Sequence, residues 1–370
     1  MNDLGQQHRP THPTLHHRRL ATTRRRPLLT SYGSAMDYRQ LFSDPELGRE
    51  FQDRFDELAS SVPAERGDLE ALDGGPTTEQ AADAAASMAE GTWGSRDGGL
   101  EAIIRRFTRP VYLVRRSTFT APTDGFPSSA EIARRLEAAR TPIEAAIPST
   151  GRIDVRNHRL NWLGTGWMVG PTLAVTNRHV AEEFARADRE LFVSRQSVGG
   201  RVVRAVVDWR REYLQPEESR FRVEQVLWIE PDTSFDVALL RIADRGEDDE
   251  APPPPIDLMS EEELRLVGVG AWIAVIGYPA QDSRNDAGDQ QRIFDGIYDV
   301  KRLAPGQLTA ITTDGLAYHD ATTLGGSSGS VLVELSTGKA AALHFGGIEG
   351  ERNHAVQAPV LSQIISEHGA

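Results

Sequence analysis

The chain has 370 residues, of which 39% are hydrophobic and 26% are charged, and it contains no cysteine. This composition excludes a wholly disordered chain. The lack of cysteine excludes disulfides, thiolate metal sites and a cysteine nucleophile. No apolar run approaches the ~20 residues that a membrane-spanning helix requires, so we expect no membrane partner.

The net charge of −13 is unevenly distributed along the chain. Residues 1–35 hold six arginines and one aspartate, a local charge of +5, which leaves −18 for residues 36–370. An acidic body repels phosphate, so we expect no nucleic-acid partner. Residues 1–35 also lack the apolar core of a secretory signal, and we expect a basic disordered tail and a cytoplasmic protein. A basic patch for an acidic partner is the alternative for this tail.

We expect residues 36–150 to form an α-rich, acidic region, whose first part, to about residue 98, has few large apolar side chains. Ser128 and Glu131 have the spacing of a capping box, which predicts a helix over residues 130–146. Residues 110–119 read as a strand rich in β-branched and aromatic side chains. We expect an accessory region that is inhibitory, an adaptor for a regulatory partner, or a support for the rest of the protein.

From about residue 151 the pattern changes to short β-rich runs separated by turn signals, which is typical of an all-β barrel or sandwich. An acidic and proline-rich stretch at residues 247–255 cannot be a central strand and divides this β region into two similar halves. Residues 359–368 close the chain with helical spacing.

Three residues of the β region could together perform nucleophilic catalysis. His179 ends an apolar strand, where its side chain can reach the mouth of a barrel, although most histidines are structural. Asp236 stands directly before an apolar strand, where it must either cap a backbone group or pair with another residue.

The stretch from Thr322 to Val333 contains three serines among Gly325, Gly326 and Gly329. Glycines allow turns that direct successive backbone N–H groups at one point, which suits an oxyanion, although a flexible turn would have the same composition. Ser328 alone has a glycine two residues before it and another directly after it, so it is the best candidate nucleophile.

A serine hydroxyl needs a general base, a histidine supplies one near neutral pH, and a buried aspartate orients the imidazole. His179 and Asp236 lie in the first half of the β region and Ser328 lies in the second half. We therefore expect the three to converge in a cleft between two β-domains.

These segments resemble those of the trypsin-like, chymotrypsin-fold serine peptidases. GTGWMV with AVTNRHVA is similar to the segment around the family's catalytic histidine, FDVALLRI to that around its aspartate, and GGSSGSVLV to its nucleophile loop. The resemblance implies a triad of His179, Asp236 and Ser328, with an oxyanion hole formed by the amides of Gly326 and Ser328.

The same resemblance implies a mostly β fold of two antiparallel six-stranded barrels with a C-terminal helix, preceded by the α-rich N-terminal extension. Barrel 1 would span about residues 151–245 and barrel 2 about residues 263–370, with a linker at residues 246–262 between them. The similarity is greatest to the disulfide-poor bacterial branch that includes the staphylococcal glutamyl endopeptidase.

The resemblance also implies candidates for substrate binding. Thr322 and Thr323 would lie at the base and wall of the pocket for the residue before the cut, and neither carries the charge that trypsin-like cleavage needs. His344 matches a histidine that faces a substrate carboxylate in the glutamyl endopeptidases, so we expect an acidic residue before the cut. A pocket for small or apolar residues is the alternative. His344 and Gly346 would also offer backbone groups to the substrate strand.

One departure from the digestive members of the family concerns activation. They carry an aspartate directly before the nucleophile, which pairs with a freed N-terminus, whereas this chain has Ser327. An N-terminal extension can therefore be kept.

The sequence thus predicts a serine endopeptidase that acts on proteins or peptides through an acyl-enzyme, with no cofactor and no metal. Two other functions use the same residues or the same fold: a non-catalytic protein-binding module, and an esterase.

Overall fold

The computed structural model describes residues 45–61, 107–121, 129–189, 191–282, 287–347 and 353–369, together with Asp83, Ala86, Ser87 and Glu90. The basic tail predicted at residues 1–35 lies outside these ranges. Among the described residues, no helix is both long enough and apolar enough to cross a bilayer.

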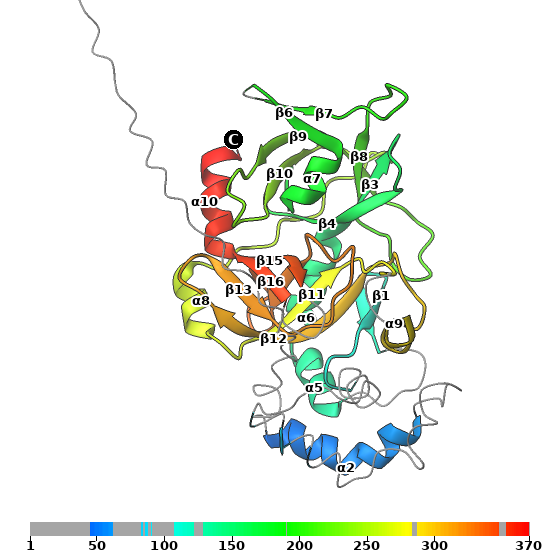
Figure 1. Cartoon of the computed structure of the whole chain (residues 1–370), viewed down its shortest axis with the longest axis vertical. Coiled ribbons are helices and arrows are strands. Elements are labelled where there is room, and N and C mark those ends of the chain that lie inside the picture. Colours follow the sequence, from blue (N-terminus) through cyan, green and yellow to red (C-terminus); the bar gives the residue numbers. More distant parts are fainter. Residues whose placement is uncertain are drawn as a thin grey trace, which may run out of the picture. The chain divides into compact units, whose positions relative to one another are not determined.

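The first half of the β region closes into an antiparallel six-stranded barrel, drawn in green in Figure 1, with the strand order β10-β5-β4-β3-β8-β9. Apolar side chains that alternate along these strands fill its interior, as expected when one face of every strand points inward. Helix α7 and a β6–β7 hairpin lie between β5 and β8 along the chain. The bounds are β3 (Thr150–Arg156), β4 (Trp162–Met168), β5 (Leu173–Thr176), α7 (Arg178–Phe184), β6 (Ala185–Asp188), β7 (Leu191–Ser194), β8 (Arg204–Asp208), β9 (Arg220–Ile229) and β10 (Ala238–Ile242).

The second half forms another six-stranded antiparallel barrel, which follows the order β11-β14-β15-β16-β13-β12 and closes where β12 pairs with β11. The chain ends in helix α10, which packs beside β15 and β16. The predicted architecture of two barrels and a C-terminal helix is therefore confirmed (Figure 1). The bounds are β11 (Trp272–Gly277), α9 (Ala287–Phe294), β12 (Arg302–Ile311), β13 (Leu316–His319), β14 (Val331–Glu334), β15 (Ala340–Gly347), β16 (Asn353–Gln357) and α10 (Ala358–His368).

The segment between the barrels, where we expected a linker at residues 246–262, is hydrogen-bonded to both of them. The N–H of Ile256 donates to the carbonyl of Met168 in barrel 1, and the N–H of Met259 donates to that of Ala340 in barrel 2. Helix α8 (Glu261–Val267) follows and begins with a complete capping box. The prolines thus keep the chain extended while its ends are held.

The N-terminal region contributes helix α2 (Pro45–Ser61), strands β1 (Tyr112–Arg115) and β2 (Thr118–Thr120), helices α5 (Ala130–Ala138) and α6 (Arg140–Ala146), and a short 3₁₀ turn at Ile147–Ser149. The prediction of one strand over residues 110–119 is wrong, because the chain reverses there. Arg116 and Ser117 both adopt positive φ, which forms the tight two-residue turn that a hairpin requires. Strand β1 then adds to the edge of barrel 2 by pairing with β12.

The predicted helix over residues 130–146 is present but divided. Its N-cap is Ser129, one residue later than predicted, and the Ser129 hydroxyl accepts the N–H of Ile132. The helix breaks at Ala139, because Pro142 has no N–H to donate to the preceding turn.

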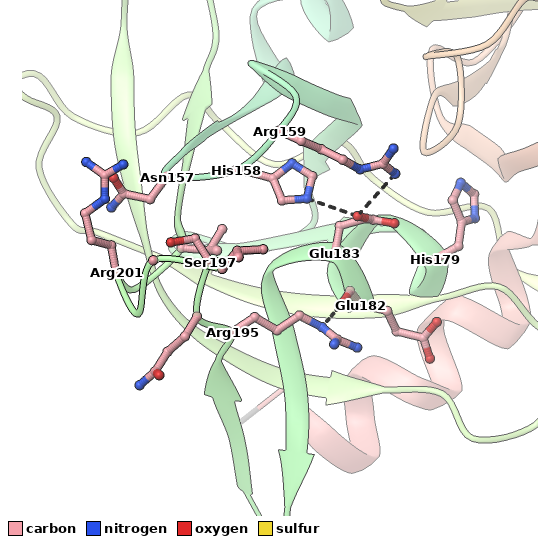
Figure 2. A pocket seen from close by; sticks show the side chains of 13 residues that line it. Asn157, His158, Arg159, His179, Glu182, Glu183, Arg195, Ser197 and Arg201 are labelled. Atoms are coloured by element: carbon pink, nitrogen blue, oxygen red, sulfur yellow. Dashed lines mark hydrogen bonds and ion pairs between the residues drawn. The ribbon is translucent and has the colours of Figure 1, made fainter.

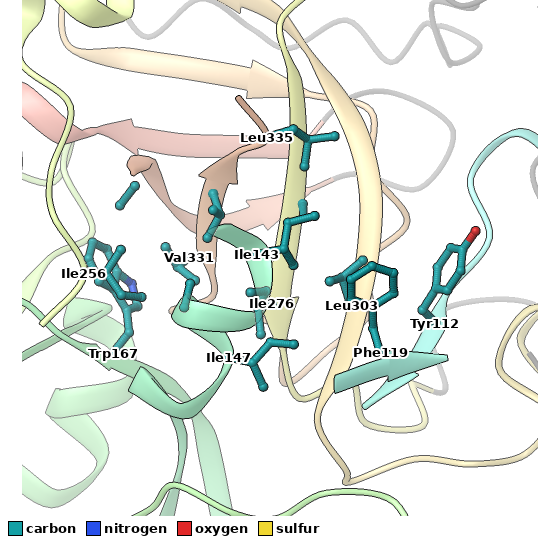
Figure 3. Close-up of a cluster of buried hydrophobic side chains, with 14 of the residues drawn as sticks. Tyr112, Phe119, Ile143, Ile147, Trp167, Ile256, Ile276, Leu303, Val331 and Leu335 are labelled. Atoms are coloured by element: carbon teal, nitrogen blue, oxygen red, sulfur yellow. The ribbon is translucent and has the colours of Figure 1, made fainter. Parts of the chain in front are cut away.

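One hydrophobic cluster joins the N-terminal region to the barrels. Figure 3 shows Tyr112, Phe119, Ile143 and Ile147 beside Leu303 of β12 and the neighbouring barrel residues. Four fully buried side chains of α2 belong to the same cluster: Leu47, Phe51, Phe55 and Leu58. Burying a side chain of this size contributes about 1.5–3 kcal/mol, so the described elements of the N-terminal region are packed as part of the core.

A buried lysine lies where the barrels and the N-terminal region meet. Lys301 is fully buried and donates from Nζ to the carbonyls of Ile147 and Trp209, with the carboxylate of Glu212 3.5 Å away. Loss of hydration outweighs these partners and lowers the pKa of Lys301 from 10.5 to about 8.

This pKa predicts a pH dependence of stability. Between pH 8 and 10.5 the unfolded chain binds more protons at this residue than the folded chain does, so stability rises with pH. From pH 8 to 9.5 the free energy of unfolding should increase by about 1–2 kcal/mol through Lys301. Urea unfolding across this range should show the increase in the wild type and in Lys339→Met, which alters the chain's only other lysine. A Lys301→Met variant with the same slope as the wild type would contradict the assignment.

Candidate active site

His179 and Asp236 meet at one end of barrel 1 because the strands that carry them are paired. The register of β10 against β5 places Ala238 opposite Thr176, so Asp236 and His179 extend beyond the same edge. The imidazole Nδ1 lies 2.5 Å from Oδ2 of Asp236, and the backbone N–H of His179 donates to Oδ1 at 3.0 Å. The carboxylate therefore holds the ring and the main chain of the same residue.

Exposure separates the roles that these two side chains can play. The His179 side chain is 48% exposed, whereas that of Asp236 is 12% exposed. The ring can thus be reached from solvent while its acceptor is shielded. Asn177, which the sequence did not single out, is fully buried and donates from its amide to the carbonyl of Asp236 at 2.8 Å. It fixes the main chain that carries the carboxylate.

The nucleophile loop consists of two tight turns that direct its amides. The carbonyl of Gly325 accepts the N–H of Ala280, and the carbonyl of Ser327 accepts the N–H of Ser330. In a trans peptide the next N–H points opposite to the carbonyl, so the amides of Gly326 and Ser328 are directed away from these partners. Neither amide has a hydrogen-bond partner among the described residues. Two neighbouring free donors can hold an oxyanion.

Both turns require glycine at their left-handed position. Gly326 has φ +84°, and a Cβ there would lie 2.3 Å from the ring of Trp162 and 2.6 Å from the carbonyl oxygen of Tyr278. Gly329 has φ +88°, and a Cβ there would lie 2.0 Å from the carbonyl oxygen of Thr165. The predicted use of glycine for special turns therefore has a specific steric reason at these two positions.

The loop of barrel 2 rests directly on a strand of barrel 1. The N–H of Thr165 in β4 donates to the carbonyl of Ser328 at 2.8 Å. A Cβ on Gly164 would lie 2.9 Å from that same carbonyl oxygen and 2.9 Å from the side chain of Val180, the residue after His179. The Ser328 hydroxyl makes no hydrogen bond to His179 in the part of the chain that the structure describes. The main chain of Ser328 and the residue after His179 nevertheless both pack against Gly164.

A buried carboxylate supports the loop from the other side. Oδ2 of Asp282 accepts the N–H of Gly325 at 3.2 Å, and the main chain of Asp282 exchanges two hydrogen bonds with the side chain of Gln290 in α9. Asp282 lies 43 residues before Gly325 and belongs to no motif, so the sequence could not indicate this contact.

Comparison with known proteins identifies the family. Residues 164–343 match the trypsin-like peptidase domain. A probable serine protease of Lysobacter enzymogenes is 32% identical over 295 residues, which cover 72% of this chain and 74% of that relative. The chain belongs to the trypsin-like serine peptidases. The prediction of a serine-type endopeptidase is thus confirmed.

Solved structures with similarity include the active form of the Rv3671c protease from M. tuberculosis, at 20% identity and a TM-score of 0.40, covering 64% of this chain and 87% of that one. A serine endoprotease from Yersinia pestis matches at 16% identity and a TM-score of 0.41, covering 62% of this chain and 65% of that one. The predicted similarity to the glutamyl endopeptidase branch of the family stays a prediction.

The residues predicted to line the peptidase's specificity pocket are already engaged with other groups. The hydroxyl of Thr322 donates to the carbonyl of Arg109, and that of Thr323 donates to Oδ1 of Asn353. His344 is 2% exposed, and its Nδ1 lies 3.1 Å from Nε2 of the fully buried His319, a residue to which the sequence assigned no role.

The backbone role that we predicted for His344 is not available in this arrangement. Its N–H donates to the carbonyl of Ser330, and its carbonyl accepts the N–H of Gly329, so both groups are used within the nucleophile loop. Gly346 keeps open space, because no atom lies within 4 Å of the position that a Cβ would take. Gly346 is paired with His354 in the β15–β16 ladder, and its predicted backbone role in substrate binding stays a prediction.

A cavity of about 750 Å³ lies beside His179 on barrel 1 (Figure 2). Its walls come from the β3–β4 turn, helix α7 and the segment after β7, and three arginines and two glutamates line it. Inside it, Nε2 of His158 lies 3.1 Å from the carboxylate of Glu183. None of its lining residues belongs to the nucleophile loop, so it extends the site over barrel 1 only. Within the described ranges, no group of three or more acidic or histidine side chains could hold a metal ion.

Replacing Gly326 tests whether its turn supports catalysis. Gly326→Ala should lower kcat by roughly 10²–10³, the usual effect of losing one oxyanion donor, because a Cβ displaces the loop from Trp162 and Tyr278. Gly200→Ala is the matched control, since Gly200 also has a positive φ (+73°) but nothing lies within 4 Å of its Cβ position. Steady-state hydrolysis of a peptide by both variants gives the comparison, and equal kcat values would count against the assignment.

Proposed function

We propose that this peptidase cleaves peptide bonds with a catalytic triad of Ser328, His179 and Asp236. The observation that supports the proposal most strongly is the double contact of the Asp236 carboxylate with the ring and the backbone of His179. A carboxylate in this position fixes the tautomer that carries its proton on Nδ1 and leaves Nε2 free to accept another.

In the proposed reaction, Oγ of Ser328 attacks the scissile carbonyl while Nε2 of His179 takes the hydroxyl proton. The carbonyl oxygen becomes an oxyanion that the free amides of Gly326 and Ser328 stabilise. The imidazolium then gives its proton to the leaving amine, which breaks the peptide bond and leaves an acyl-enzyme. A water molecule repeats the sequence and releases the acid.

Electrostatics assigns Asp236 the task of stabilising the imidazolium. A positive ring forms only during the reaction, so a fixed negative charge beside Nδ1 stabilises the transition state more than the ground state. The carboxylate is bound by two N–H groups of His179, which hold it in place without reorganisation. We expect the hydrogen bond between Ser328 and His179 to form when substrate binds, since catalytic hydrogen bonds that are long in the free enzyme commonly shorten in the substrate complex.

Two variants test the triad. Asp236→Asn should lower kcat by about 10⁴, because the amide favours the wrong tautomer of His179, and Ser328→Ala should remove turnover of a peptide substrate. Labelling of the wild type by a fluorophosphonate, with no labelling of Ser328→Ala, identifies the nucleophile. An unlabelled wild type would favour the binding module, and turnover of esters without peptides would favour the esterase. A loss below tenfold in Asp236→Asn would contradict its role.

We further propose an acidic residue before the cut, held by His344. Nδ1 of His319 is buried without a partner among the described residues, so we assign the single proton of His319 to its other nitrogen, Nε2. Nδ1 of His344 then accepts this N–H, and its own proton lies on Nε2, which is free to donate to a carboxylate.

The charge state of this pair defines how such a substrate would be held. Burial lowers the pKa of His319 to about 3 and that of His344 well below its ordinary value, so both rings are neutral at neutral pH. An acidic side chain would therefore be bound by N–H donors and not by a preformed cation. The approach of its carboxylate would in turn raise the pKa of His344.

A substitution in the pocket tests this preference. His344→Leu removes the donor at similar volume, and the ratio of kcat/KM for a substrate with glutamate before the cut to one with leucine should fall by about 10–100-fold, as for loss of a hydrogen bond to a charged group. His368→Gln, in α10 and stacked on Trp228, is the control and should keep the wild-type ratio. An unchanged ratio in His344→Leu would contradict the role of His344 in selecting an acidic residue and would favour the alternative of a pocket for small or apolar residues.

A further inference from the structure

A buried cation from the N-terminal region pairs with a carboxylate beside the predicted pocket. Arg109 is 1% exposed and precedes β1. Its Nε and Nη2 lie 2.9 and 2.5 Å from the two oxygens of Asp320, a forked ion pair whose carboxylate side chain is 6% exposed. Nη2 also donates to Oε1 of Gln307, and Nη1 donates to the carbonyl of Thr108.

Such a pair requires good geometry to exist. Removing two charges from water costs several kcal/mol for each ion, and a forked guanidinium–carboxylate contact offsets this only when the remaining donors and acceptors are also satisfied. Here Oδ1 of Asp320 additionally accepts the N–H of Gln307 at 2.7 Å, and the guanidinium lies 5.1 Å from the centre of the Trp272 ring. The pair is therefore fixed in one position.

The pair lies within the segment that would form the pocket. Asp320 follows His319, the partner of His344, and precedes Thr322 by two residues. The hydroxyl of Thr322 donates to the backbone carbonyl of Arg109 at 3.0 Å. Arg109 thus holds segment 319–323 at two points, one through its side chain and one through its main chain.

The β1–β2 hairpin, which follows Arg109, is held by both barrels. Leu113 of β1 is paired with Arg302 of β12 in barrel 2. On the side of barrel 1, the N–H of Tyr213 donates to the carbonyl of Val114, and the N–H of Ser117 donates to the carboxylate of Glu212. The position of Arg109 is therefore set by the assembled enzyme.

We propose that Arg109 is a positioning residue that holds segment 319–323 in place and thereby forms the pocket for the residue before the cut. This inference rests on the proposed function, because the pocket is part of it. The N-terminal region then acts as a support that the active enzyme keeps. Loss of the forked pair should loosen the pocket wall without moving His179, Asp236 or the free amides of the nucleophile loop.

The kinetic test compares substrates that differ only before the cut. Arg109→Gln should raise KM at least tenfold for substrates with a long side chain there, change kcat less than about threefold, and leave a substrate with glycine at that position unaffected. Arg135→Gln is the matched control, because its guanidinium lies 4.8 Å from the same Trp272 ring but its carboxylate partner is Glu131. An equal rise in KM for substrates with long side chains and for the substrate with glycine, or no rise in either, would overturn the proposal.

A double variant separates positioning from simple stability. Arg109→Gln leaves the Asp320 charge buried without its partner, which destabilises the fold. Combining Arg109→Met with Asp320→Leu removes both charges, so this double variant should be more thermally stable than Arg109→Gln. It should still have a raised KM for substrates with long side chains and an unchanged KM for the substrate with glycine. Recovery of stability and discrimination together would show that the fork has only a structural role.

Hydrogen exchange gives a measurement that does not depend on turnover. The N–H of Asp320, which donates to the carbonyl of Gln307, and its neighbours in segment 319–323 should exchange faster in the Arg109 variants, whereas amides in barrel 1 should not change. Unchanged exchange in this segment would refute the proposal even in an active enzyme. If the wild type cleaves no substrate and takes no fluorophosphonate, the proposed function fails, and the exchange result still decides the role of Arg109.

Discussion

The hydrogen bond from Thr165 to the carbonyl of Ser328 makes one site out of two barrels. Each barrel satisfies its own strands and fills its own interior, so neither needs the other for closure. This contact, together with the close approach over Gly164, places the nucleophile loop against the helix that carries His179. Any side chain larger than hydrogen at Gly164 would separate the two parts, which explains why a glycine stands inside a barrel strand.

Sequence patterns predicted the parts of the molecule that local chemistry encodes. Short β-rich runs and turn signals indicated an all-β barrel or sandwich, and the resemblance to the trypsin-like peptidases implied the two barrels that the structure contains. The setting of His179 and Asp236 indicated a contact that is also present. The hairpin at Arg116 and Ser117 was missed because neither residue is the glycine, asparagine or aspartate that a two-residue turn with positive φ favours. Pairing of β1 with β12 stabilises the hairpin in spite of this. The capping position was misplaced by one residue where two serines stand together.

Contacts between distant segments could not be predicted in the same way. Arg109 and Asp320 are 211 residues apart, and neither belongs to a motif. Asp282 and Asn177 likewise support the site through backbone groups that any residue possesses. Their importance depends on burial, which only the assembled structure provides. Lys301 belongs to the same group, because its lowered pKa follows from complete burial between three segments.

The separation of Arg109 and Asp320 along the chain has a consequence for biosynthesis. At about 5–20 residues per second, a ribosome needs roughly 10–40 s to add the residues that separate them. During this interval the guanidinium has no carboxylate to join, and strand β1 has no neighbour in β12. A nascent chain therefore cannot complete this buried ion pair or the β1–β12 pairing before barrel 2 has been synthesised, so the β1–β2 hairpin has no anchor on that side until then.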